Sequence, residues 1–185
     1  KAIIMVEGNV LNKQEKEYVL LYKPRGVVTT TSDEKNRKTV LDLIKTNKRL
    51  YPVGRLDYDT TGILLLTNDG ELTNLLLHPK NNIDKVYIAK IKGIMDGKTI
   101  HDLERGVKTE DFKASPCKVK VRKTDKKTNT SLVQLTIHEG KNHQVKKMFS
   151  SLGYEVIKLK REQIAFLDLT GLKPGEYRNL TIKEV

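Results

Sequence analysis

The chain has 185 residues, and its 35 Lys and Arg against 23 Asp and Glu give a formal net charge of +12 and a pI near 9.6. A hydrophobic content of 37% suits one generous domain or two small subdomains sharing a sheet, and no apolar run approaches the length of a membrane span. The basic excess favours a polyanionic partner. Nucleic acid ranks above an acidic membrane, because the sequence has no basic amphipathic helix with large apolar anchors.

Reactive residue types for a metal or cofactor site are scarce. The single cysteine, Cys117, allows no disulfide within the chain and is expected to be a half-buried strand residue rather than a nucleophile. The four histidines are scattered and there is no pair of cysteines, so the sequence does not predict a zinc site. The phosphate-loop, GxGxxG and GxSxG motifs are also absent. With no signal-peptide pattern either, we expect a cytoplasmic protein without metal or cofactor.

Apolar runs and turn residues predict the elements of the first half of the chain. In chain order these are a strand, turn and polar linker over 1–17, strands over 18–22 and 27–31, a surface loop over 32–38, a short helix capped by Thr39 with Asp42, a loop over 54–62, a buried strand over 63–66 and a helix over 72–76 that ends before Pro79.

The second half is predicted in the same way. Its expected elements are a strand over 85–92, a helix over 98–105, strands over 118–122 and 132–137 around a hairpin loop at 123–129, a helix from Asn142 to Gly153, a strand-rich stretch over 155–169 and a last strand after Pro174 and Gly175. No regular strand–helix–strand rhythm is present, which predicts an α+β fold around a mixed, mainly antiparallel sheet flanked by helices.

The loop at 54–62 holds the densest group of reactive side chains. Arg55, Asp57, Asp59 and Thr60 lie there between two glycines, directly before a buried strand. Asp57 is interpreted in one of two ways: as a turn residue that accepts hydrogen bonds from backbone N–H groups, or as a catalytic carboxylate. A glycosidase pair of Asp57 and Asp59 is disfavoured, because two positions in one loop do not set the separation that such chemistry needs across a sugar.

Two groups of basic side chains are candidates for nucleic-acid contact. In the helix from Asn142, an apolar stripe turns inward and leaves His143 and Lys146 together beside it. This face is either a solvated surface or an RNA-facing one, and His143 alone reads better as a structural histidine than as a catalyst. In the strand over 118–122, Lys118, Lys120 and Arg122 share one face, which we expect to contact RNA.

Four blocks of the sequence carry a family resemblance. GRLDYDTTGILLLTNDG, over 54–70, closely resembles the central motif of the RsuA-type ribosomal RNA pseudouridine synthases. Three further blocks occur in that family's order: YVLLYKPRGVVTT (18–30), KVYIAKIKG (85–93) and EGKNHQVKKMFSSLGYEVIKLKR (139–161). The nearer relatives by this resemblance are the large-subunit, RluB-like branch.

The resemblance implies three catalytic residues. Asp57 matches the essential aspartate, which acts at C1′ or at the 2′ position of the ribose, and Tyr87 matches the tyrosine that packs against the uracil. Lys146 matches the basic residue that pairs with the aspartate. Many relatives have Arg there, so in this chain a point charge replaces a bidentate fork.

The resemblance also implies residues that bind the substrate. Arg55 matches a residue implicated in replacing the flipped base, and Lys23 and Arg25 belong to a block that supports the site. The further expected contacts with substrate or RNA are Thr60, His143, Gln144, Lys147 and Arg161.

The implied protein is the catalytic domain of a cofactor-independent enzyme. Residues 18–185 are expected to form two subdomains with the active site in their cleft, and residues 1–17 to be the end of an S4-type RNA-binding domain plus a linker. The implied reaction converts a uridine of ribosomal RNA to pseudouridine by cleaving N1–C1′, rotating the base and rejoining it through C5, on a monomer. A non-catalytic RNA-binding or ribosome-assembly protein on the same scaffold is the alternative, and a glycosylase that stops after cleavage is a third reading.

Overall fold

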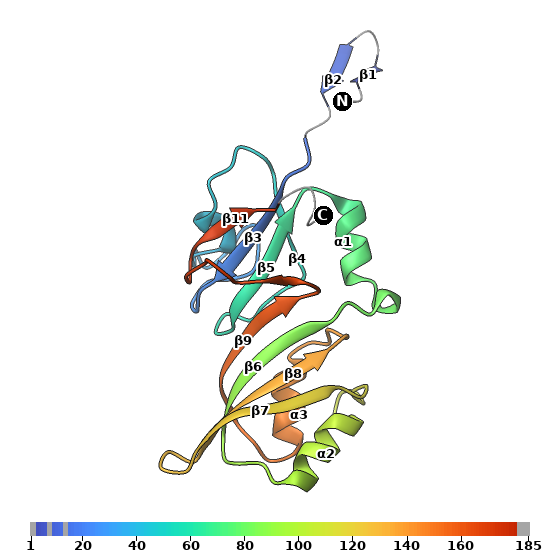
Figure 1. Ribbon diagram of the computed structural model, residues 1–185. Coiled ribbons are helices and arrows are strands. Elements are labelled where there is room, and N and C mark those ends of the chain that lie inside the picture. The colour runs from blue at the N-terminus through green and yellow to red at the C-terminus, as the bar shows by residue number, and fades with distance from the viewer. Residues whose placement is uncertain (1–2, 7–8, 13–14, 181–185) are drawn as a thin grey trace.

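The computed structural model describes residues 3–6, 9–12 and 15–180, which form one nine-stranded sheet, a separate two-stranded sheet and three α-helices (Figure 1). The strands are β1 (Ile3–Val6), β2 (Asn9–Asn12), β3 (Tyr18–Lys23), β4 (Tyr51–Val53), β5 (Thr61–Thr67), β6 (Lys85–Lys92), β7 (Lys118–Asp125), β8 (Thr130–Ile137), β9 (Val156–Ile164), β10 (Leu167–Asp168) and β11 (Tyr177–Asn179). The helices are α1 (Gly70–Leu77), α2 (Gly97–Arg105) and α3 (Gln144–Ser151), with short 3-10 turns at Val40–Leu43 and Pro79–Asn81.

The large sheet has the order β11-β3-β5-β9-β6-β8-β7, with β4 paired to β5 and β10 to β9. Every pairing in it is antiparallel except that of β5 with β9, which is parallel. This confirms the predicted α+β fold with a mixed, mainly antiparallel sheet. We call β3, β4, β5 and β11 the upper half-sheet and β6 to β9 the lower half-sheet; Figure 1 shows α1 beside the upper one and α2 and α3 at the lower one.

Strand β5 is the centre of the upper half-sheet and is buried on both faces. Leu64 and Leu66 pack into one apolar cluster with Val19, whereas Ile63 and Leu65 pack into a second cluster with Leu20. Burial on both faces explains why this strand reads as an unbroken apolar run rather than as an alternating pattern. The predicted buried strand over 63–66 is therefore confirmed.

The lower half-sheet is covered on one face by α3. Val145, Met148 and Phe149 of this helix are buried against the sheet, as their helical spacing predicts. The helix begins at Gln144, two residues later than expected, because His143 adopts a left-handed conformation with φ 51° and cannot continue the helix toward Asn142.

Two other predictions along the chain differ from the structure. Residues 27–31 form no strand: only Val28 makes a bridge, to Thr39, before the chain bends. Strand β7 extends to Asp125, so that the hairpin loop is shorter than predicted. The strand predicted near the start is present as β1, which pairs with β2; the reading of residues 1–17 as the end of an S4-type domain stays a prediction.

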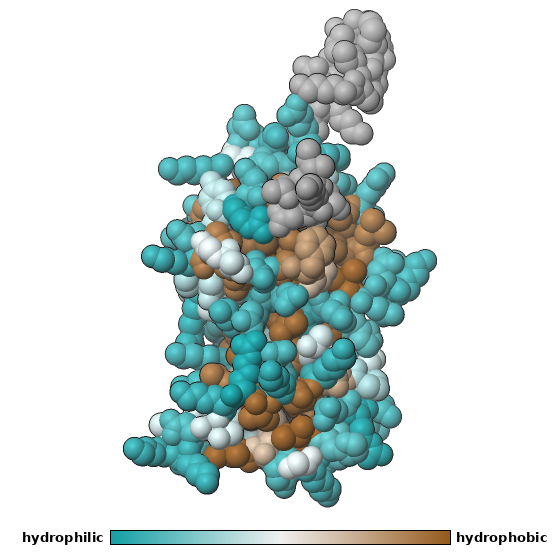
Figure 2. Space-filling view, in the orientation of Figure 1, coloured by the Kyte–Doolittle hydropathy of each residue, from teal (hydrophilic) through white to brown (hydrophobic). Residues whose placement is uncertain are grey.

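Helix α1 leaves apolar side chains at the surface. Its N-terminus is capped by Asp69, which accepts N–H bonds from Glu71 and Leu72 at 3.1 and 3.2 Å. Leu75 and Leu77 are 59% and 50% exposed. Figure 2 shows apolar surface in the region of α1. No helix in the described part of the chain is long and apolar enough to cross a membrane.

The two half-sheets meet where β5 pairs with β9. This ladder has only two register pairs, Thr61 with Lys160 and Gly62 with Arg161. A Cβ added to Gly62 would lie 2.0 Å from the Arg161 carbonyl oxygen, and the φ of Gly62 is 122°, so both space and backbone conformation require glycine. The Arg161 side chain, 4% exposed, donates from Nε and Nη2 to the Ile63 carbonyl oxygen at 3.0 and 2.8 Å.

We predict that Gly62→Ala lowers the free energy of unfolding by roughly 3 kcal/mol, because the methyl group must force the two strands apart. The measurement is urea denaturation followed by circular dichroism. Gly70→Ala is the matched control: nothing lies within 4 Å of the added Cβ at this first residue of α1, so its effect should stay within about 1 kcal/mol. Equal effects of the two substitutions would contradict the steric argument.

Candidate active site

A cavity of about 680 Å³ lies between the 54–62 loop and the start of α3. The loop contributes Asp57 and Thr60, the segment before and within α3 contributes His143 and Lys146, and β6 contributes Tyr87. Residues from three blocks that are far apart in the sequence therefore line one space.

The loop holds its shape around a buried lysine. Lys23 is fully buried, and its Nζ donates to the carbonyl oxygens of Thr60 at 2.7 Å, Pro24 at 3.1 Å and Tyr58 at 3.4 Å. Burial lowers the pKa of Lys23 to about 8, although the charges of Asp59 and Asp57 act in the opposite direction. The ammonium thus organises the backbone beneath the site rather than facing the cavity.

Two backbone contacts fix the other side of the loop. The Thr29 hydroxyl donates to the Leu56 carbonyl oxygen at 2.8 Å, and Gly26 N–H donates to the Tyr58 carbonyl oxygen at 2.8 Å. Because these contacts flank Asp57 on both sides, its position is set by main-chain bonding as well as by the following strand.

Two basic side chains from the start of α3 contact Asp57. His143 Nδ1 lies 2.8 Å from Asp57 Oδ2, and Lys146 Nζ lies 3.4 Å from the same oxygen. Among the described residues, both of these contacts end on Oδ2 of Asp57. The carboxylate side chain is 31% exposed, so a ligand in the cavity can reach it.

Lys146 also holds a second aspartate, and more closely. Its Nζ donates to Asp59 Oδ1 at 2.8 Å. That hydrogen bond is the main reason that the pKa of Asp59 lies below its usual range. Partial burial opposes the charged form of Lys146, but the hydrogen bond to Asp59 and the charge of Asp57 outweigh it and raise the pKa of the ammonium.

The other predicted site residues fall into two groups. Arg55, Thr60 and Gln144 line the same cavity as Asp57 and Tyr87. Four residues are elsewhere: Lys23 lies beneath the loop, Arg25 is exposed near Asp59, Lys147 pairs with Asp111 at 2.7 Å, and Arg161 is buried at the strand junction.

Some residues of the cavity were not anticipated. Arg37 lines it, with its guanidinium 5.7 Å from the centre of the Tyr58 ring, and the sequence offered only a basic residue in a polar loop as a signal. The bond between Lys146 and Asp59 was also missed, since Asp59 was considered only as a partner of Asp57. Within the described ranges, no three His, Cys, Asp or Glu side chains gather as metal ligands.

Known proteins resemble the chain in sequence. A family model described as RNA pseudouridylate synthase matches residues 17–151. "Ribosomal large subunit pseudouridine synthase B" of Bacillus subtilis is 55% identical over 183 residues, which cover 98% of this chain and 75% of that protein. An "Uncharacterized RNA pseudouridine synthase" of Aquifex aeolicus is 40% identical, over 99% of this chain and 74% of that protein.

Solved structures resemble the fold. One described as "Crystal structure of pseudouridylate synthase" is 32% identical with a TM-score of 0.82, over 95% of this chain and 75% of that one. The archaeal box H/ACA sRNP Nop10-Cbf5 complex matches at 16% identity with a TM-score of 0.56, over 80% of this chain and 47% of that one, a likeness of fold alone. Together with the family model and the 55% identity, these matches confirm the resemblance of the motifs: the chain belongs to the RNA pseudouridylate synthase family.

Proposed function

We propose that this protein converts a uridine of large-subunit ribosomal RNA to pseudouridine, with Asp57 as the essential carboxylate. The main support is the geometry at Asp57, a carboxylate that opens onto a cavity while two basic side chains contact one of its oxygens. The relative from Bacillus subtilis carries the large-subunit activity in its name. The strongly basic composition suits an RNA substrate.

The cavity suits a uridine rotated out of its stack. Unstacking costs a few kcal/mol, which contacts between basic side chains and phosphates can offset. In this proposal Asp57 meets the ribose of the flipped nucleotide, while Tyr87 packs against the uracil. The Lys146 ammonium places a positive charge beside the carboxylate, and His143 holds the carboxylate in position through its 2.8 Å contact.

The isomerisation conserves every atom of the nucleotide. The N1–C1′ bond breaks, the uracil rotates while it is held, and C5 forms the new bond to C1′ as the proton on C5 passes to N1. We further propose that the protein acts as a monomer in the cytoplasm.

We predict that Asp57→Asn lowers pseudouridine formation roughly 10³-fold or more and leaves RNA affinity nearly unchanged, because the amide keeps the shape but cannot carry the charge. The measurement is single-turnover conversion of ribosomal RNA transcripts, read by pseudouridine-specific chemical mapping. Asp111→Asn is the matched control, since this aspartate pairs with Lys147 outside the cavity. Near-wild-type turnover of Asp57→Asn would contradict the proposal, and free uracil among the wild-type products would indicate cleavage without rejoining.

A basic surface lies on the face of the lower half-sheet turned away from the cavity. Register places Lys118 and Lys120 of β7 beside Thr136 and Gln134 of β8, whereas the intervening Val119 faces the core under α3. The same face carries further basic residues in adjacent register rows, and we call the set the open sheet face: Lys90, Lys118, Lys120, Arg122, Lys123, Lys158 and Lys160.

Charge complementarity favours RNA on this face. Glu162 offsets part of the charge by pairing with Arg122 at 3.0 Å, but Lys118, Lys120 and Lys158 are exposed at the surface. Tyr87 points to the face of β6 opposite to Lys90, and that face lines the cavity. An RNA that contacts the open sheet face must therefore extend around an edge of the sheet from the target uridine. A ribosomal RNA is large enough to do so, whereas a short stem-loop is not.

We predict that replacing Lys118, Lys120 and Arg122 by Gln weakens binding of long RNA and reduces the slope of log K against log salt by about 2, because fewer counterions are released. Binding of a minimal stem-loop should change little. The measurement is a salt titration of affinity for both RNAs. A control with the same loss of charge, at the exposed Lys45, Lys80 and Lys98, should leave both slopes nearly unchanged; equal slopes in the two triple variants would argue against this surface.

A further inference from the structure

The start of α3 lacks an ordinary helix cap. His143 occupies the N-cap position in a left-handed conformation, and its side chain makes no capping bond to the first turn. The imidazole instead turns to Asp57, at 2.8 Å. The first turn of a helix has N–H groups without partners inside the helix. Because no side-chain cap determines the first residue of α3, another contact must fix where this helix begins.

Gln144 provides that contact from the first residue of the helix. Its side chain is buried, and both ends of the amide are engaged: Oε1 accepts a hydrogen bond from Lys141 N–H at 3.0 Å, and Nε2 donates to Glu139 Oε2 at 2.6 Å. Its own backbone N–H donates to the Lys141 carbonyl oxygen at 3.1 Å. The amide thus locks the turn over 139–144 that leads into α3.

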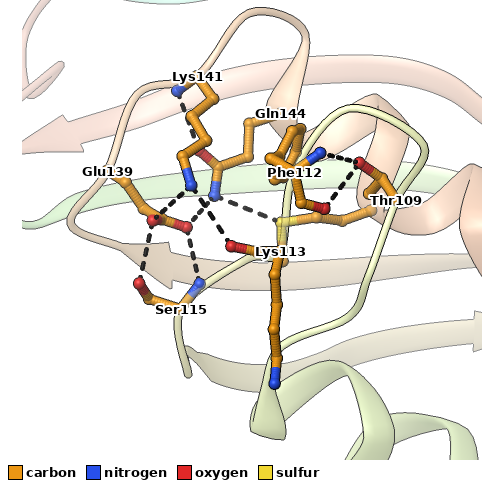
Figure 3. Close-up of polar contacts among 8 residues, drawn as sticks. Thr109, Phe112, Lys113, Ser115, Glu139, Lys141 and Gln144 are labelled. Carbon is orange, nitrogen blue, oxygen red and sulfur yellow. Dashed lines mark hydrogen bonds and ion pairs between the residues drawn. The ribbon is translucent and has the colours of Figure 1, made fainter.

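Glu139 ties this turn to a different part of the chain. Its carboxylate accepts hydrogen bonds from Ser115 N–H at 2.9 Å and from the Ser115 hydroxyl at 3.0 Å, and Lys141 Nζ lies 3.5 Å away (Figure 3). Burial alone would raise the pKa of Glu139, but the bonds from Ser115 and Gln144 outweigh it, so its pKa lies below the usual range.

The Ser115 anchor is itself held in place. Ala114 N–H donates to the Val107 carbonyl oxygen at 2.9 Å, which ties the segment before β7 to the residues that follow α2. Lys141 also reaches this segment, with Nζ 3.4 Å from the Lys113 carbonyl oxygen and 5.0 Å from the centre of the Phe112 ring. Figure 3 shows Ser115, Lys141 and Gln144 meeting at the Glu139 carboxylate, whereas the Lys113 side chain points away from it.

We propose that Glu139 and Gln144 are a positioning pair that sets where α3 begins and thereby places His143 and Lys146 against Asp57. Gln144 lines the cavity, but its amide is engaged by Lys141 N–H and Glu139, so the pair acts through the helix start. This inference rests on the proposed function of Asp57. It predicts that changes in the pair alter the rate of the chemical step more than they alter RNA binding.

The pair can be tested by exchanging its two side chains. In Gln144→Glu two carboxylates face each other where a 2.6 Å hydrogen bond now lies, so we expect kcat to fall about 10- to 100-fold with little change in KM. Glu139→Gln can still present an oxygen to Gln144 and Ser115, so its kcat should stay within about threefold of wild type. Glu139→Ala removes every one of these bonds and should resemble Gln144→Glu.

The double variant Glu139→Gln/Gln144→Glu gives the decisive comparison. The amide introduced at position 139 can donate to the new carboxylate, while Lys141 N–H keeps an acceptor, so we expect kcat to recover about tenfold relative to Gln144→Glu alone. Recovery stays partial because Ser115 N–H loses its acceptor. Glu155→Gln, at an exposed carboxylate ahead of β9, is the control for a simple loss of charge and should leave kcat unchanged.

A readout that needs no turnover separates this inference from the proposed function. The ring ¹⁵N and ¹H NMR signals of His143 should move in Gln144→Glu toward those of Asp57→Asn, in which the contact is weakened, and should return in the double variant. If the signals and kcat stay at wild-type values in Gln144→Glu while only the melting temperature falls, the pair is structural and the inference is wrong. If the signals behave as expected but the wild type forms no pseudouridine, the proposed function fails and the positioning role stands.

Discussion

The arrangement of the whole molecule depends on the short parallel contact between β5 and β9. It consists of two register pairs between the two half-sheets. Two apolar clusters belong to one half-sheet each, and a third cluster, which includes Ile63 of β5 and Ile164 of β9, spans both. The 54–62 loop leads directly into β5, while α3 packs on the other half-sheet beside β9. The separation between Asp57 and the basic residues of α3 is therefore set by how closely Gly62 approaches Arg161.

Burying the guanidinium of Arg161 at this junction requires compensation. Both of its bonds to Ile63 end on one carbonyl oxygen, which carries no full negative charge. A second cation, Lys85, is close enough that burial and Arg161 together lower its pKa, while Glu139 acts in the opposite direction. Glu139 thus contributes negative charge to a crowded basic interior in addition to its hydrogen bonds at the start of α3. One carboxylate links the electrostatics of the junction to the geometry of the site.

Periodicity was enough to predict most of the fold. The apolar stripe of α3, the unbroken run in β5 and the alternation in β6 each follow from local burial, so a single sequence reveals them. The start of α3 was misplaced because His143 has a left-handed backbone that no local sequence pattern indicates. Its ring contacts Asp57, 86 positions away in the chain. Residues 27–31 have strand-forming composition, but Thr29 bonds to Leu56 instead of to a neighbouring strand.

Only part of the candidate site could be predicted, because many of its contacts join residues that are far apart in the sequence. The motif resemblance pointed to Asp57, Tyr87 and Lys146, and these do line one cavity. No local pattern could indicate that Lys23 lies beneath the loop, because its burial depends on carbonyl groups that the 54–62 segment presents only once folded. The role of Glu139 in the site could not be predicted either, because its partner Ser115 lies 24 residues earlier in the chain.

The Lys146 ammonium is shared between two aspartates, an arrangement that does not require the fork of a guanidinium. An ammonium cannot bind one carboxylate through two parallel bonds, but it can donate to separate acceptors in different directions. Here the shorter bond goes to Asp59, at 2.8 Å, and the longer contact to Asp57, at 3.4 Å. Asp59 thereby fixes the ammonium, and His143 supplies the close contact to Asp57 that a second guanidinium nitrogen would otherwise make. In the proposed reaction, a fixed charge beside the Asp57 carboxylate would need little reorganisation, which is the property that favours catalysis.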